Sequence, residues 1–111
     1  MTLLEKTSWY LKGSKDGTFS NFSDEDWNRI ESEFIELVER CDDGSSIQKA
    51  LALDVDYEIP YDVRLSLHRK LVELEPDNVR AIHDYAFYLR AFGEPSDELL
   101  AQELFKRIEG K

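Results

Sequence analysis

Residues 21–41 read NFSDEDWNRIESEFIELVERC, and this stretch predicts an amphipathic helix. Ser23 is a suitable N-cap, and three acidic residues follow it in the first turn, where the helix dipole favours carboxylates. Phe22 and Trp27 have the spacing of a hydrophobic staple. Apolar residues then recur every three or four positions and form one stripe: Trp27, Ile30, Phe34, Leu37, Val38 and Cys41. One clearly helical segment of this kind favours a helical fold.

Similar patterns on both sides extend this expectation to the whole chain. A first helix is expected over residues 3–12 with Leu4, Trp9 and Leu11 buried, followed by a loop from Gly13. Ser45 and Gln48 resemble a capping box that opens a short helix to about Leu53. Three more helices are expected, one after Pro60, one after Pro76 and one after the turn GEPSD; their apolar residues include Val63, Leu67, Leu71, Ile82, Tyr85, Ala86, Leu89, Leu99, Leu100 and Leu104. The sequence therefore predicts an all-α protein of about six antiparallel helices, with residues 1–111 in a single domain.

Composition and charge restrict the possible functions. The 111 residues carry a net charge of −10, and the stretch from Asp24 to Asp62, with thirteen acidic and three basic residues, accounts for all of it. Such a field repels nucleic acid and attracts basic protein surfaces. No segment has the roughly 18 apolar residues of a membrane helix, and the N-terminus is too polar for a secretory signal. The single cysteine, Cys41, fits a reducing compartment, so a cytoplasmic protein is expected.

The C-terminal half resembles a tetratricopeptide repeat. HRKLVELEPDN, residues 68–78, is similar to the end of one repeat and its proline turn, and the sequence from 78 to 94 is similar to the first helix of the next. The resemblance covers residues 45–109 and is degenerate before residue 68. It implies a stack of helix pairs that binds other proteins without catalysis. Because stable arrays need about three units, residues 1–44 are expected to cap the stack.

Residues 54–62, DVDYEIPYD, contain most of the candidate site residues. Asp54, Asp56 and Glu58 have the spacing of the first EF-hand ligands, but Ile59 and Leu65 stand where that loop needs glycine and glutamate. No nucleophile motif or phosphate-binding loop accompanies the acids, which argues against an enzyme. We therefore expect no catalytic residue, no metal site and no cofactor.

Partner binding is the remaining interpretation of this segment. If it is extended, Val55 and Ile59 anchor it to the helices and the carboxylates point outward. Its tyrosines offer the rigid amphipathic area that interfaces favour. The candidate residues are Asp54, Asp56, Tyr57, Glu58, Tyr61 and Asp62.

A second candidate surface follows from the repeat resemblance. The groove-facing positions of the repeat fall on Arg80, His83, Phe87 and Arg90, with Asp84 beside them. That face is basic and would suit an acidic peptide, with arginine as the bidentate donor. His68 is expected in the core, where the repeat packs an aromatic residue, and His83 on the outside.

The sequence thus predicts a non-enzymatic protein–protein interaction module whose partner has a basic surface. The alternative is an immunity protein or antitoxin that neutralises a basic nuclease toxin by covering its active site with acidic residues. The first hypothesis places the site between Arg80 and Arg90, and the second places it between Asp54 and Asp62.

Overall fold

The computed structural model describes residues 1–109, and in this range it contains six α-helices, one 3-10 turn and no strand. The prediction of an all-α fold with about six helices is confirmed. The helices are α1 (Leu3–Asp16), α2 (Asp24–Arg40), α3 (Gly44–Leu53), α4 (Tyr61–Leu74), α5 (Val79–Phe92) and α6 (Glu98–Glu109), and the 3-10 turn η1 (Pro95–Asp97) precedes α6.

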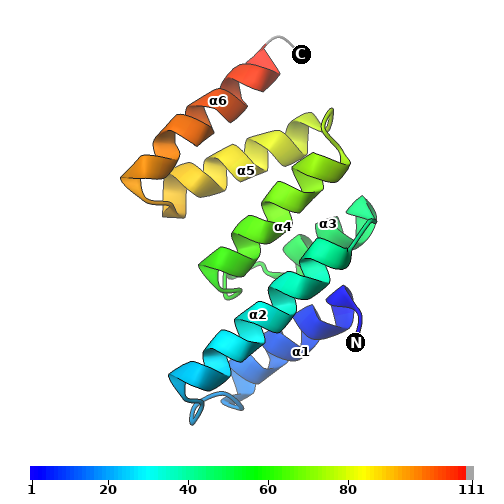
Figure 1. Cartoon of the computed structure of the whole chain (residues 1–111), viewed down its shortest axis with the longest axis vertical. Coiled ribbons are helices and arrows are strands. Elements are labelled where there is room, and N and C mark those ends of the chain that lie inside the picture. Colours follow the sequence, from blue (N-terminus) through cyan, green and yellow to red (C-terminus); the bar gives the residue numbers. More distant parts are fainter. Residues whose placement is uncertain (110–111) are drawn as a thin grey trace.

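The helices stack along the 48 Å long axis of a molecule that measures 30 and 21 Å in the other directions (Figure 1). At one end α1 packs against α2 and α3, and both of these pack against α4. From there the order is linear, because α4 contacts α5 and α5 contacts α6. No helix in the described range is long and apolar enough to cross a membrane. The result is a stack of helical hairpins with α4 and α5 near its centre.

Side-chain caps fix where four of the helices begin, and Thr2 is the cap of α1. Ser23 accepts a hydrogen bond from the Asp26 N–H, and Asp26 accepts one from the Ser23 N–H, so the predicted N-cap of α2 is confirmed. In α5, Asn78 caps the Ala81 N–H. The capping box expected at Ser45 is wrong, because α3 is capped two residues earlier by Asp43, which accepts a hydrogen bond from the Ser45 N–H.

The first helix is longer than its sequence suggests. It continues past Gly13 to Asp16 and ends at Gly17, whose φ of 79° lies in the left-handed region that favours glycine. Gly13 lies inside the helix, and no larger residue fits there because a Cβ would come within 2.5 Å of the Phe19 ring. The glycine therefore makes room for an aromatic residue and does not break the helix.

The core runs through the centre of the stack, and its fully buried side chains include Phe34, Val38, Ile47, Val63, Leu67 and Ile82. Three expected core positions are wrong. Trp9 is 37% exposed, at the edge of α1, and Leu99 and Leu100 lie on the outer face of α6, with Leu99 72% exposed. Since α6 is the last helix, no further element within residues 1–109 covers that face.

Candidate functional site

The buried carboxylate of Asp54 binds backbone groups of the loop between α3 and α4. Its side chain is 2% exposed, and its Oδ1 accepts hydrogen bonds from the Glu58 N–H at 2.7 Å and the Ile59 N–H at 3.2 Å. Its Oδ2 pairs with Arg64 Nη1 at 2.5 Å, and Arg64 Nη1 also donates to the Asp54 carbonyl. The expectation that this carboxylate points outward is therefore wrong. Asp54 holds the loop closed.

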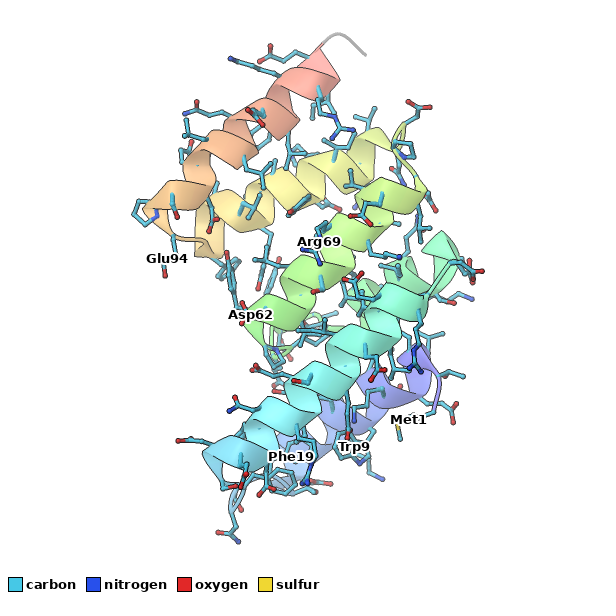
Figure 2. All side chains as sticks on the ribbon, in the orientation of Figure 1. Met1, Trp9, Phe19, Asp62, Arg69 and Glu94 are labelled. Carbon is cyan, nitrogen blue, oxygen red and sulfur yellow. The ribbon has the colours of Figure 1, made fainter. Side chains whose placement is uncertain are left out.

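The loop turns where an extended strand was expected. Tyr57 has a φ of 56°, in the left-handed region, and this turn breaks the alternation of side chains. Ile59 is buried as expected, whereas Val55 is 73% exposed and anchors nothing. Of the remaining acids, Asp56 is exposed. Glu58 is half-buried, while Asp62 lies exposed in the first turn of α4 (Figure 2).

The two tyrosines of the loop have different surroundings. Tyr61 donates from its hydroxyl to Asp97 Oδ2 at 3.1 Å, which ties the start of α4 to η1. Burial, together with this hydrogen bond, raises the pKa of Tyr61 to about 12. Tyr57 is half exposed, and its ring lies 4.4 Å from the Arg64 guanidinium carbon and 6.3 Å, nearly parallel, from the ring of Tyr88. Tyr57 is thus the more exposed of the two tyrosines.

A groove of about 540 Å³ lies beside this loop, between α3, α4 and α5. Helix α3 contributes one wall with Gln48 and Leu51, and the ring of Tyr57 lines it from the loop. The opposite wall is the exposed face of α5, where Phe87 is 53% exposed. The acidic loop and the α5 face were expected to be alternative sites, but the structure joins them in one groove through Tyr57.

Only part of the predicted basic face lines this groove. Arg80, Asp84 and Phe87 share one side of α5, because i, i+4 and i+7 positions superpose along a helix. His83 and Arg90 are rotated toward α6. The His83 ring lies 5.8 Å from that of Phe105. Arg90 lies over Phe105 at 4.7 Å and pairs with Glu98 at 2.7 Å. Arg90 therefore contacts residues of α6 and does not line the groove.

Two polar residues of α4, Arg64 and His68, also line the groove. His68 is 4% exposed and stacks parallel to Tyr85 at 6.0 Å, so its expected place in the core is confirmed. Neither of its ring nitrogens has a hydrogen-bond partner among the described residues, and the same holds for Arg64 Nε. Burial, with the Arg64 charge adding to it, lowers the pKa of His68 to about 3, so the ring is neutral at pH 7.

Sequence reasoning did not identify the groove-lining role of these residues, although a signal exists. Arg64 and His68 are four residues apart and directly follow Val63 and Leu67 of the apolar stripe. Two polar residues at helical spacing beside buried leucine and valine indicate a polar strip along the core-facing side of the helix.

The groove is close to electrically neutral. Arg64 is compensated by Asp54, and Arg80 Nε lies 3.8 Å from Asp84 Oδ2 on the same helix. Gln48, at its edge, donates to Glu75. The selection of acidic peptides by a basic face stays a prediction, and the arginines of that face each have a carboxylate nearby. Within residues 1–109 there is also no group of three or more His, Cys, Asp or Glu side chains that could hold a metal ion.

Part of the acidic middle third is also neutralised by ion pairs. Lys6 pairs with Glu33 at 3.1 Å, and Arg69 on α4 pairs with Glu39 at 2.9 Å. These contacts join α2 to its neighbours. A negative field remains, because several acids of this stretch have no ion pair within the described residues: Asp24, Glu25, Glu31, Asp42, Asp43, Asp56, Glu58 and Asp62.

The chain matches no protein-family model, no curated protein and no solved structure, so the function is argued from this geometry alone.

Proposed function

We propose that the chain is a non-enzymatic protein-interaction module that holds a segment of a partner protein in the groove between α3, α4 and α5. The observation that carries this proposal is the groove itself, which has a volume of about 540 Å³ and an exposed aromatic ring, Phe87, in one wall. Exposed apolar groups with polar neighbours are typical of binding surfaces. Aromatic residues such as Tyr57 and Phe87 contribute much of the free energy at protein interfaces.

The resemblance to tetratricopeptide repeats supports the same proposal, because the groove lies on α3, α4 and α5, within the region of that resemblance. The partner offers a short segment, since the groove is too small for a folded surface but suits a few residues of extended chain. Cys41, the single cysteine, supports a cytoplasmic site of action.

The test is capture of partners on the immobilised protein, with two matched variants. Phe87→Ala removes the ring from the groove wall, and the double variant Asp56→Asn/Asp62→Asn removes charge outside it. A partner that Phe87→Ala loses and the double variant keeps supports the groove. Equal retention by both variants, or no captured partner, contradicts it.

The second candidate function is inhibition of a basic toxin, and the observation that favours it is the exposure of Asp56 and Asp62 in the acidic middle third. Because exposed charges act over distance mainly on association, such a partner binds more slowly as salt rises. In the same experiment the double variant then loses the partner, and Phe87→Ala retains it.

A further inference from the structure

An aromatic cluster lies at the edge of the groove and consists of Tyr57, Tyr61, Tyr88 and Phe92. The ring of Tyr88 contacts the other three, at centroid distances of 5.0 Å to Phe92, 5.7 Å to Tyr61 and 6.3 Å to Tyr57. Tyr57 and Tyr88 also line the groove, and Phe92 follows one turn beyond Tyr88 on α5. The aromatic cluster therefore continues the groove surface past its own lining.

Two rings of the aromatic cluster are open to solvent. Tyr57 and Phe92 are each about half exposed, and their ring centroids lie 5.1 Å apart. Tyr88, which contacts both, is buried. A side chain of a partner that rests on one of the exposed rings therefore also reaches the other. Exposed aromatic residues beside a groove are typical of binding surfaces.

Exposed carboxylates adjoin the aromatic cluster in the chain. Asp56 directly precedes Tyr57, and Asp62 directly follows Tyr61. Both acids are exposed, and neither has an ion pair within residues 1–109. The charge beside the exposed rings is therefore negative, whereas the groove itself is close to neutral.

Arg64 shows that a guanidinium group fits against these rings. Its Cζ lies 4.4 Å from the ring centroid of Tyr57 and 5.2 Å from that of Tyr88. The ring quadrupole attracts a cation to the aromatic face. Because Arg64 is buried and paired with Asp54, its own charge is compensated and does not repel a second cation strongly.

Among the protein side chains, arginine suits the exposed rings best. Its planar guanidinium group stacks on an aromatic face and still has N–H donors left for a carboxylate. The ammonium group of lysine is more strongly hydrated and does not stack. A carboxylate is repelled by the acids and by the negative faces of the rings. An aliphatic side chain gains apolar contact only and makes no use of Asp56 and Asp62.

We infer that the exposed pair Tyr57 and Phe92 is a subsite for an arginine side chain of the segment held in the groove; this rests on the proposed function. The partner segment then has an apolar residue in the groove beside Phe87 and, next to it, an arginine that extends over Tyr57 and Phe92. The acidic residues act beside the groove and not within it.

Selection of peptides from a random octapeptide library displayed on phage, with the whole chain immobilised, tests the inference. We expect enrichment of arginine at one fixed position next to an apolar residue. In a synthetic peptide from that selection, arginine is then replaced by citrulline, which has the same shape and a neutral urea group. This replacement is expected to weaken binding about 5- to 30-fold, the range for the loss of a partly exposed cation–π contact. The comparison uses the unaltered protein and does not depend on the folding of a variant.

Two variants separate the failure of this inference from that of the proposed function. Phe92→Leu keeps an apolar side chain at a half-exposed position and removes the ring, so the preference for arginine over citrulline is expected to fall while the citrulline peptide binds as before. Phe87→Ala, in the groove wall, is expected to remove binding of both peptides.

The outcomes distinguish the two claims. Peptides that depend on Phe87 but have no fixed arginine, or bind equally well with citrulline, overturn the arginine subsite only. An unchanged preference for arginine in Phe92→Leu has the same meaning. Peptides that ignore Phe87, or no enrichment at all, overturn both the subsite and the proposed function.

Discussion

His68 combines a buried place in the core with two nitrogens that have no partner, and this has a consequence for acid stability. The folded state keeps the ring neutral down to about pH 3, whereas the unfolded chain takes up a proton near pH 6.5. The unfolded state therefore binds more protons between these values, and the stability falls as the pH falls, by about 1.4 kcal/mol per pH unit for this residue.

The difference between wild type and His68→Phe isolates this contribution. Urea unfolding at pH 7 is expected to give free energies within about 1 kcal/mol of each other, because the unpartnered nitrogens contribute no net stability. From pH 6 to pH 4 the variant should become progressively the more stable protein. A constant difference across that range would contradict a neutral buried His68.

Asp54 and Asp56 are two residues apart and offer a matched pair of variants. Asp54→Ala leaves Arg64 buried without its partner and removes the acceptor for two backbone N–H groups, so a loss of about 3–5 kcal/mol is expected. Asp56→Ala changes an exposed residue and should stay within about 0.5 kcal/mol of wild type. Chemical denaturation of both variants gives the comparison, and equal losses would mean that Asp54 does not hold the loop.

These residues also show where sequence reasoning reached its limit. The buried places of Phe34, Ile82 and His68 could be predicted, because helical periodicity assigns each residue to a face. The buried place of Asp54 could not, since it depends on Arg64 ten positions later and on a turn at Tyr57. A pattern of alternating residues predicts a strand and contains no sign of such a turn.

Among the elements, α2 depends on a cap that the sequence identified. Ser23→Ala removes the acceptor for the Asp26 N–H and breaks the capping box, so a loss of about 1 kcal/mol is expected. Ser20→Ala, in the preceding loop, is the control, because Ser20 is exposed and no side-chain hydrogen bond of it is present in the described structure. Thermal unfolding of the two variants measures the difference; a control that is equally destabilised would contradict a role of the cap.

The helices of the candidate site were predictable, but their mutual arrangement was not. The positions on α5 that line the groove follow from helical spacing once its neighbours are known, and the sequence placed Arg80 and Phe87 on one face. The sequence also assigned Arg90 to that face. In the structure Arg90 pairs with Glu98 at the start of α6, and no local pattern around Arg90 indicates this contact. Contacts between helices therefore decided which residues meet in the groove.

For the whole molecule, the net charge of −10 has a measurable effect on stability. Ion pairs such as those of Lys6 and Arg69 offset only part of the repulsion among the acidic residues of the middle third. Salt screens interactions between exposed charges over about 10 Å at 0.1 M, so the free energy of unfolding is expected to rise from 20 to 200 mM NaCl.

A variant with less charge serves as the control for this salt effect. Glu25→Gln/Asp42→Asn removes two exposed acids that have no ion pair within the described residues. Its stability in low salt should exceed that of wild type, and its response to salt should be smaller. A fall in stability with added salt would show that the ion pairs outweigh the repulsion.

The linear order of the stack also determines how the chain responds to mechanical force. Because α6 packs mainly against α5 and the turn before it, a pull on the two ends meets the helices in series. The hydrogen bond from Tyr61 to Asp97 spans 36 residues of sequence and fastens that outer hairpin to α4. Under tension α6 and the turn before it, which share little of the buried core with α4, are expected to separate before α5, whose Ile82 and Ala86 are fully buried, so the molecule lengthens in steps.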